Sequence, residues 1–385
     1  MISIIAVVLS PYLALLPLAG IAYKVLRGDY EIPINPLNFG FFLLFVWSLI
    51  SGVLNESMES IIGSGVILLF LSLNVFLQNQ YAEEEKIYDL VKKVWQISMI
   101  AGILGLTEKI LSYFYDMTWV SDLFWSPNYI PTVENYRIYA TFGNPNVAGS
   151  WFAAMVLVSI YLFEKNRGRQ GIPYATGIVL FSLTLIFTGS IGATAALLLA
   201  LLVYMVLSKN RTLRFILLGI FAFVLLVALS SPEVNHSLNP RNNLWIESMQ
   251  LFLEKPLAGW GLFGILETIG NIHSHNIWIQ LIATFGLVGL SIYMWARTYV
   301  YQTIQKLYKR GSSIVPLLAS VQGVMIFHGI VDFTLMTPQG GILFFGSASL
   351  LSALVWKEEK YPVIAKRPRR ARAGKVAAKG QYYER

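Results

Sequence analysis

The sequence predicts an all-α, polytopic integral membrane protein with about eleven transmembrane helices, ten to twelve being the range. Hydrophobic residues make up 56% and charged residues 13% of its 385 residues, whereas an average soluble domain has roughly 25% charged residues. The mean hydropathy of +0.59 points the same way. Continuous apolar runs of about 17–25 residues recur along the chain, and each is long enough to cross a hydrocarbon layer of ~30 Å.

We place the spans, in chain order, at residues 2–23, 37–55, 61–79, 95–115, 147–163, 173–188, 190–207, 213–230, 276–296, 314–335 and 341–356. The first has no basic n-region and no small-residue cleavage site, so we interpret it as a retained span and not as a signal peptide. Pro11 and Pro17 leave open that it consists of two half-helices, because proline disrupts a helix interior. Residues 1–356 would then form one transmembrane domain, followed by a basic tail, 357–385, that we expect to be disordered.

Positive charge determines the predicted orientation, because Lys and Arg stay on the cytoplasmic side of a membrane. Counted over alternate connections, 25 of the 29 Lys and Arg residues fall on one side. That side holds Lys24, Arg27, Lys86, Lys92, Lys93, Lys165, Arg167, Arg169, Lys209, Arg211, Arg214, Arg297, Lys306, Lys309, Arg310 and ten residues after Trp356. The other side holds Lys109, Arg137, Arg241 and Lys255. We therefore expect the C-terminus in the cytoplasm and two long loops, residues 116–146 and 231–275, outside. The net charge of +8 follows from this topology and does not indicate a nucleic-acid partner.

The loop 231–275 contains the amphipathic stretch NNLWIESMQLFLEKP. One apolar stripe at helical spacing consists of Trp245, Met249, Phe252 and Leu253. The pattern predicts a helix lying on the outer membrane surface, capped at its start by Asn242 or Asn243 and followed by Pro256. Arg241 would directly precede this helix, where its dipole disfavours a cation. Arg241 therefore needs an anionic partner, which is either Glu233 or Asp122 of the chain or an anionic ligand.

Two of the four histidines, His273 and His275, precede Asn276 at the start of a span. An imidazole accepts a proton near neutral pH and is the commonest general base, although a histidine at a helix start also serves as a cap or surface residue. The His-x-His spacing does not put two ligands on one helix face, and no cluster with a carboxylate is visible, so we predict no metal. The chain has no cysteine, which excludes a thiolate nucleophile or ligand. Ser237 and Ser274 leave a serine nucleophile open, but its usual elbow signature is missing.

Further polar residues stand near the ends of other spans. His328 and Asp332 lie at i, i+4 in the span 314–335 and either orient a catalytic group or satisfy each other. Glu108 and Lys109 lie in the outer half of the fourth span, where they either snorkel or face an internal cavity. Asn144 and Asn146 either cap the next helix or bind substrate. The aromatic residues of the loop 116–146 form an interfacial belt or stack on sugars, and they are Trp119, Trp125, Tyr129, Tyr136 and Tyr139.

Several stretches together resemble the superfamily of O-antigen ligases and polymerases. HSHNIWIQLIATFGLVGL is similar to its His-Asn-x-x-x-Gln and Gly-x-x-Gly signature, and RNNLWIESMQLFLEKPLAGWGL to its Arg-x-x-x-Trp helix with Pro-Leu-x-Gly-x-Gly. ATFGNPNVAG, FTGSIGATAALLLALL and HGIVDFTL resemble further elements of the family and appear in the family's order. The resemblance covers about residues 137–335; each element is modest alone, and the set is fairly specific.

The resemblance implies a metal-independent membrane glycosyltransferase of the GT-C type without a cofactor. Such an enzyme takes a glycan from an undecaprenyl pyrophosphate carrier on the outer face of the bacterial cytoplasmic membrane and passes it to a lipid-linked or polysaccharide acceptor. Membrane lipids would surround it. His275 would be the general base, and Arg241, helped by Arg137, would hold the pyrophosphate. The other candidate substrate-binding residues are His273, Asn276, Asn144, Asn146, Lys255, Lys109, His328 and Asp332.

One position departs from the family pattern. The arginine that follows Thr-Gly-Ser in the family is Ile191 here. If that arginine binds pyrophosphate, another cation must replace it, and Arg137, Lys109 and Lys255 are the outside candidates besides Arg241. Two hypotheses from other classes stay open: a secondary transporter, which predicts paired broken helices in two halves, and a non-catalytic scaffold of an envelope-glycan assembly complex.

Overall fold

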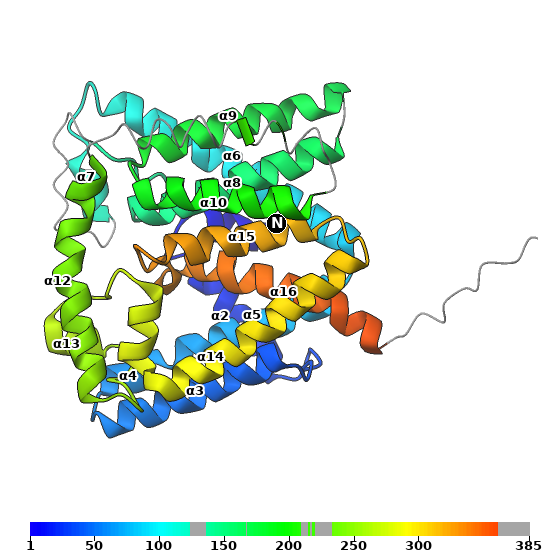
Figure 1. Cartoon of the computed structure of the whole chain (residues 1–385). Helices are drawn as coiled ribbons and strands as arrows, with labels where there is room; N and C mark the ends of the chain where they lie inside the picture. The colour runs from blue at the N-terminus through cyan, green and yellow to red at the C-terminus, as the bar shows by residue number, and fades with distance from the viewer. Residues whose placement is uncertain (124–135, 167, 209–214, 216–217, 220–232, 361–385) are drawn as a thin grey trace, which may run out of the picture.

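The computed structural model describes residues 1–123, 136–166, 168–208, 215, 218–219 and 233–360, and at residues 118, 121–122, 233–240 and 357–360 it describes the backbone alone. Every regular element in this part of the chain is a helix (Figure 1). The prediction of an all-α protein is therefore confirmed. The predicted basic tail lies almost wholly outside the described residues.

Seven helical segments of the described chain are long and apolar enough to cross a membrane, which supports the polytopic membrane class. They are α3 (Pro36–Leu54), α4 (Met58–Gly63) continued by α5 (Gly65–Gln80), α6 (Glu84–Leu111), α8 (Pro145–Lys165), η2 (Gly168–Gly171) continued by α9 (Ile172–Phe187), α14 (Ile277–Lys309) and α16 (Pro338–Lys360) as far as Trp356. Three shorter apolar helices are α2 (Leu15–Leu26), α10 (Ile191–Leu207) and α15 (Val315–His328). The predicted span 213–230 falls mostly outside the described residues, so the count of eleven stays a prediction.

The predicted first span is two helices, α1 (Ile2–Leu9) and α2, with a turn between them. Pro11 lies in this turn, where Leu13 N donates to Ser10 Oγ at 3.3 Å. Pro17 lies in the first turn of α2, where a missing N–H breaks no helical hydrogen bond. The alternative of two half-helices is confirmed, and the break lies at Pro11.

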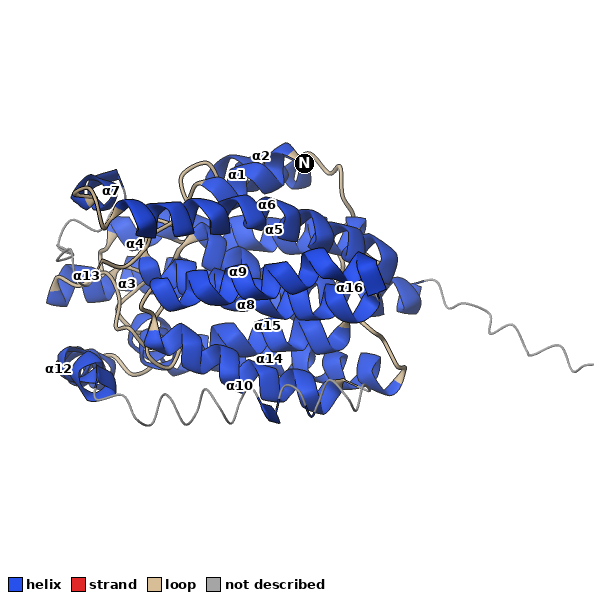
Figure 2. Cartoon of the chain, turned by 90° about the horizontal axis from the view of Figure 1, so that it is seen from above, coloured by secondary structure: helices blue, strands red, loops and turns tan. Residues whose placement is uncertain are grey.

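The helix α8 lies inside the bundle and contacts α9, α10 and α15 (Figure 2). It is buried at every position from Val147 to Leu162. Gly149 allows α10 to approach closely, since an added Cβ would lie 2.8 Å from the Ser190 Cβ and 2.9 Å from the Ala193 Cβ. Small residues at helix contacts are usual where membrane helices pack tightly. This buried helix carries Asn146 and Ser150, which both reach the candidate site described below.

The connections that the charge count assigns to the cytoplasm are joined to one another. Ser313 Oγ donates to Glu84 Oε2 at 2.7 Å, and Asn166 Nδ2 donates to the Tyr88 hydroxyl at 3.0 Å. At the opposite end lie α7 (Thr118–Leu123), α12 (Glu233–Glu254) and α13 (Gly264–Ile269), where α12 runs across the helix ends (Figures 1 and 2). The described parts of both long loops therefore lie at one end of the bundle, and α16 ends at the other.

We expect Asn235 and Gly374 to lie on opposite sides of the membrane, because the charge bias places the α12 end outside and the C-terminus inside. The natural chain has no cysteine, so single cysteines at these two positions can be labelled without interference. A membrane-impermeant maleimide added to intact spheroplasts should label Asn235→Cys and not Gly374→Cys, and detergent should expose both. Labelling of both variants from the outside would contradict the topology.

The amphipathic segment is helical, but α12 begins at Glu233 and not near Asn242. The helix continues through Pro240, although proline lacks the N–H that a helix interior uses. Its buried residues are Leu244, Ser248 and Leu251, whereas Leu253 of the predicted stripe is exposed. The buried residues differ from the predicted stripe because α12 packs on α13 and α14. Contacts within the protein therefore determine which face of α12 is buried.

Arg241 consequently lies inside α12 and not at its N-terminus. The predicted conflict with the helix dipole does not arise, because the dipole effect is confined to the first turn. The side chains of both predicted partners, Glu233 and Asp122, lie outside the described residues.

The segment after α12 fills a kink in α14 at Gly286, where φ is 63° and ψ is −167°. Trp260 N donates to Ala283 O at 2.9 Å and so satisfies a carbonyl near the kink. A Cβ on Gly286 would lie 2.2 Å from Leu257 O, so only glycine fits here. This docking holds the second long loop against the first half of α14, at whose start the two histidines lie.

Arg297 belongs to α14 and not to a cytoplasmic connection. Its guanidinium donates to Gln322 Oε1 and lies 5.2 Å from the centroid of the Phe344 ring. The predicted span ended at residue 296 because the apolar window stops at the first cation, whereas the helix continues to Lys309. Arg297 therefore lies in a helix and not in the predicted connection, and its assignment to the cytoplasmic set stays a prediction.

Candidate active site

The loop that carries the histidines is joined to the chain that follows α15. Ile277 N donates to Gly329 O at 2.6 Å, and Asn276 Nδ2 donates to Ile330 O at 2.8 Å. These two bonds bring Asp332, which lies more than fifty residues further along the chain, against His275.

Asn276 is the N-cap of α14, since its Oδ1 accepts from Trp278 N at 2.9 Å and from Ile279 N at 3.1 Å. His275 immediately before it has a φ of 53°, which a non-glycine residue rarely adopts. The preceding residue, Ser274, is buried, and its N–H donates to Gln280 Oε1 at 2.8 Å. The contacts on both sides hold His275 in a strained backbone conformation, and such strain is found mainly at functional sites.

His275 and Asp332 form a direct pair, with 3.0 Å between Nδ1 and Oδ1. The pairing predicted at i, i+4 was between His328 and Asp332, but α15 ends at His328 and the chain leaves the helix before Asp332. His328 Nδ1 instead shares a hydrogen bond with Ser150 Oγ at 2.6 Å. The carboxylate that the sequence assigned to His328 therefore orients His275.

Asp332 is buried, and its Oδ1 also accepts from Phe333 N at 2.7 Å. Burial alone would raise the pKa of the Asp332 carboxyl, but the hydrogen bond from His275 and the nearby histidines outweigh burial and leave this pKa below its usual range. An ionised carboxylate only accepts hydrogen bonds. Nδ1 of a neutral His275 therefore carries the proton, and Nε2 is left as the basic nitrogen.

His273 lies beside His275, with 4.2 Å between the ring centroids. Its Nδ1 accepts from His275 N at 3.2 Å. Burial, followed by the charges of His275 and Arg241, lowers the pKa of His273 to about 4. His273 is thus neutral at the pH of a cell and acts on its neighbour as a hydrogen-bond acceptor.

Potential ligand atoms of His273, His275 and Asp332 lie within 4.8 Å of one another, so the structure completes a cluster that the sequence pattern lacked. Two histidines and a carboxylate are a donor set that metals use. In this chain Asp332 Oδ1 is engaged by His275 and by a backbone N–H, and the charge of Arg241 acts on His273. These contacts fit a hydrogen-bonded acid–base pair, and the expectation of no metal stays a prediction.

Two arginines that the charge count predicts to be outside lie near the same cluster. The charges of Arg241 and Arg137 both act on His328. Arg137 Nη2 donates to Asn146 Oδ1 at 2.7 Å, and its Nε donates to Thr188 O at 2.6 Å. Arg241 of α12 and Arg137 of the first long loop thereby bring positive charge to the end of the bundle at which His275 lies.

Asn144 and Asn146 have different roles. Asn144 is the N-cap of α8 and accepts from Asn146 N at 2.8 Å, which is the structural alternative that the sequence left open. Asn146 uses its side chain to hold Arg137.

The two remaining cations that the charge count predicts to be outside, Lys109 and Lys255, form contacts within the fold. Lys109 is buried, and its Nζ donates to Tyr136 O at 2.9 Å. Its neighbour Glu108 accepts from the Tyr136 hydroxyl at 2.6 Å and from Tyr139 N at 2.9 Å. Both members of this pair therefore face inward and hold the end of the first long loop.

Lys255 bonds Asn55 Oδ1, and its Nζ lies 3.5 Å from the ring centroid of Trp260. Of the five loop aromatics, Tyr136 and Tyr139 are buried and Trp119 is exposed. Trp125 and Tyr129 lie outside the described residues.

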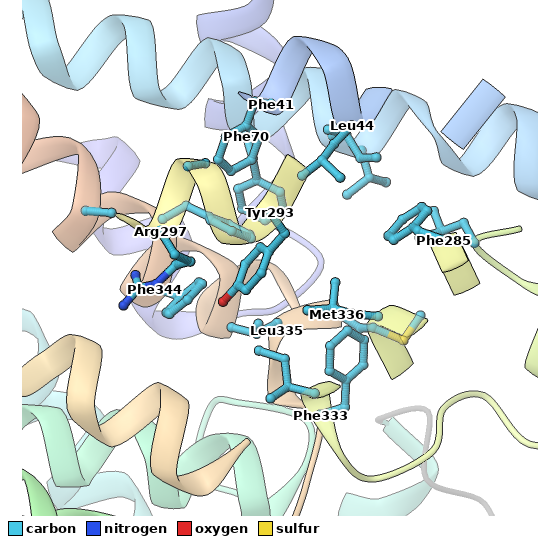
Figure 3. Close-up of a pocket in the computed structure, with 18 of the residues that line it drawn as sticks. Phe41, Leu44, Phe70, Phe285, Tyr293, Arg297, Phe333, Leu335, Met336 and Phe344 are labelled. Atoms are coloured by element: carbon cyan, nitrogen blue, oxygen red, sulfur yellow. The ribbon is translucent and has the colours of Figure 1, made fainter. Parts of the chain in front are cut away.

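An apolar cavity of about 230 Å³ adjoins the site (Figure 3). Ile277, next to Asn276, and Phe333, next to Asp332, lie in its wall. Its lining residues are apolar except for Tyr293 and Arg297. Neither was among the site residues that the sequence predicts, although a cation at the end of an otherwise apolar helical stretch was the available signal for Arg297.

Comparison with protein families adds one finding. A family model described as O-antigen ligase matches residues 176–294, a segment that contains Arg241, His273 and His275 but not Arg137 or Asp332. No curated protein matches the chain.

Proposed function

We propose that this chain, whose residues 176–294 match a family model described as O-antigen ligase, transfers a glycan from an undecaprenyl pyrophosphate carrier to a lipid-linked or polysaccharide acceptor. The reaction would take place on the outer face of the bacterial cytoplasmic membrane, with the C-terminus in the cytoplasm. The observation that carries the proposal is the pair of His275 and buried Asp332 at the end of the bundle to which Arg241 and Arg137 bring positive charge.

The proposed chemistry needs one proton acceptor and a stabilised leaving group. The acceptor hydroxyl gives its proton to His275 Nε2 as its oxygen attacks the first carbon of the donor sugar. The bond from that carbon to the pyrophosphate breaks, and its electron pair leaves on the phosphate oxygen. Asp332 holds His275 in the correct tautomer and stabilises the imidazolium that forms, which is the usual role of a buried carboxylate behind a catalytic histidine.

Arginine side chains supply positive charge where the oxyanion develops, which is the kind of electrostatic stabilisation that lowers such barriers most. Arg241 and Arg137 are the residues that we assign to this role. The proposal that no metal is required follows from this assignment, because two guanidinium groups offer charge and paired hydrogen bonds to a pyrophosphate.

Arg137 also accounts for the departure at Ile191. Its side chain lies against Gly189, two residues before Ile191, with Cγ and Nε each 3.1 Å from where a Cβ would be. The turn that carries the family arginine therefore meets an arginine that comes from another loop. We propose that Arg137 replaces the missing cation.

We expect Arg137→Ala to lose activity on the order of 10²-fold, the loss typical of one missing oxyanion contact, and Gly189→Ala to lose part of that. An added Cβ would push the Arg137 side chain aside by a few tenths of an ångström and would also strain a residue whose φ is +61°. Gly28→Ala is the matched control, since Gly28 has a φ of +80° but nothing within 4 Å of the added Cβ. The measurement is the initial rate of glycan transfer by each variant at equal protein levels. Equal losses in both glycine variants would mean that strain alone, and not Arg137, causes the effect.

The function is tested with the purified chain in nanodiscs that contain a lipid-linked glycan donor. Appearance of a longer glycan on a second donor molecule would identify a polymerase, and appearance on a lipid A core acceptor would identify a ligase. Movement of the donor across the bilayer of a proteoliposome without bond exchange would identify a transporter instead. Neither transfer nor transport, by folded protein that binds the donor, would favour the scaffold hypothesis and overturn the proposal.

A further inference from the structure

Gln280 is a buried amide side chain in the mostly apolar first half of α14. It is 3% exposed, and its helix neighbours Ile277 and Leu281 are buried apolar residues. An amide in such surroundings is costly unless its polar atoms form hydrogen bonds. Both ends of this amide do so: Oε1 accepts from Ser274 N at 2.8 Å, and Nε2 donates to Thr284 Oγ1 at 3.1 Å. The side chain is therefore fixed, with its oxygen directed at the backbone of Ser274.

Helix geometry explains why a residue at position 280 reaches this backbone. Gln280 lies one turn after the N-cap Asn276, and its N–H donates to Asn276 O at 2.8 Å. Side chains of a helix lean towards its N-terminus, so a side chain one turn into α14 reaches the chain that enters the helix. The Ser274 N–H can only donate, so the atom that faces it must be the amide oxygen. A side chain without an acceptor would leave this N–H without its partner, which is costly inside a protein.

The contact with Gln280 restrains the backbone on which His275 lies. Ser274 is held through its N–H by Gln280, and its Oγ donates to Asn276 O at 2.9 Å. Both neighbours of His275 are thereby fixed, and between them His275 has a φ of 53°. A residue with a Cβ keeps such a conformation only where its surroundings enforce it. A His275 that relaxed to a negative φ would move its ring away from Asp332, whose Oδ1 lies 3.0 Å from Nδ1.

We propose that Gln280 is a positioning residue, which holds the chain before α14 so that the His275 ring meets Asp332. The role rests on the proposed function, in which His275 accepts the proton. Gln280 acts through His275 and carries no step of the reaction itself. Its loss should therefore lower the rate of glycan transfer and leave donor binding unchanged, because the charges that hold the donor come from the arginines.

The test replaces Gln280 by methionine, which keeps an unbranched side chain and offers only a weakly accepting thioether. We expect kcat of Gln280→Met in nanodiscs to fall on the order of 10²-fold, the cost of misplacing a reacting group by about 1 Å, with an unchanged Kd for the donor. In a His275→Ala background the same substitution should cause no further loss. Gln78→Met is the matched control, since Gln78 is also buried and donates to Asn38 Oδ1 at 3.1 Å, but lies near the opposite end of α5 from α4. Its kcat should stay near the wild-type value.

A second measurement needs no glycan transfer. The chain has four histidines, so isotopically labelled histidine gives few nuclear magnetic resonance signals. The hydrogen-bonded Nδ1 proton of His275 is the signal that disappears in His275→Ala. We expect Gln280→Met to shift or lose this signal and Gln78→Met to keep it, because only Gln280 restrains the chain before α14.

An unchanged signal in folded Gln280→Met would overturn the inference. A further loss of kcat in the His275→Ala background, or an equal loss in Gln78→Met, would do the same, because the effect would then be one of general stability. If Gln280→Met loses the signal but the wild type transfers nothing, the positioning role stands and the proposed function fails. If the wild type transfers glycan and the signal is unchanged in Gln280→Met, the proposed function stands and the positioning role fails.

Discussion

The His275→Ala variant is expected to lose activity by about 10²–10⁴-fold, the usual contribution of general acid–base catalysis. The variant should stay folded and still bind the lipid-linked donor, because the charges that hold the donor come from the arginines. The measurement is the initial rate of glycan transfer by purified protein in nanodiscs, together with donor binding on the same preparation. Equal rates for wild type and His275→Ala would remove His275 from the mechanism.

His273→Ala is the matched control, since the two rings are neighbours and only His275 pairs with Asp332. We expect a much smaller loss. Because the pKa of His273 is lowered to about 4, His273 does not change charge between pH 5 and 8 and contributes no step to the activity profile there. The shape of that profile should therefore be the same in His273→Ala and in wild type. A greater loss in His273→Ala than in His275→Ala would reverse the two roles.

Arg241→Ala is expected to be nearly inactive, with a loss of roughly 10²–10³-fold from one missing contact to the developing oxyanion. Arg241→Lys should recover little of this, because a lysine lacks the planar fork that binds two phosphate oxygens at once. The loss should appear in donor binding as well as in rate, which separates Arg241 from His275. Transfer at the wild-type rate by Arg241→Ala, with normal protein levels in the membrane, would show that the assignment is wrong.

The polytopic class and the separation of the two loop sets could be predicted from the sequence, because hydropathy and charge act locally along a membrane-spanning chain. His275 and Arg241 could be named from their motifs. The partner of His275 could not, because Asp332 reaches it through a contact between distant parts of the chain. The i, i+4 spacing pointed to His328 on the assumption that α15 continues, but the helix ends there.

Other differences have the same origin in tertiary packing. The start of α12 was placed by capping signals near Asn242, but the helix begins at Glu233, and its later part packs through Leu251 on Ile265 and Ala283. Arg297 was taken for a loop residue because an apolar window cannot show that a cation bonds Gln322 inside the bundle. The sequence named Arg137, Lys109 and Lys255 as candidates for the cation missing at Ile191, and the packing of Arg137 on Gly189 is what favours Arg137 in our proposal.

The proposal that His275 accepts the proton and that Asp332 acts only through His275 is tested most directly by a double-mutant cycle. Transfer rates are measured for wild type, His275→Ala, Asp332→Asn and the double variant in the same nanodiscs with the same donor. Residues that act as a unit are strongly non-additive, so the double variant should be no slower than His275→Ala alone, and Asp332→Asn should itself lose activity by about 10²-fold or more. If the two losses multiply instead, or if Asp332→Asn transfers glycan at the wild-type rate, the 3.0 Å pair is not the catalytic unit.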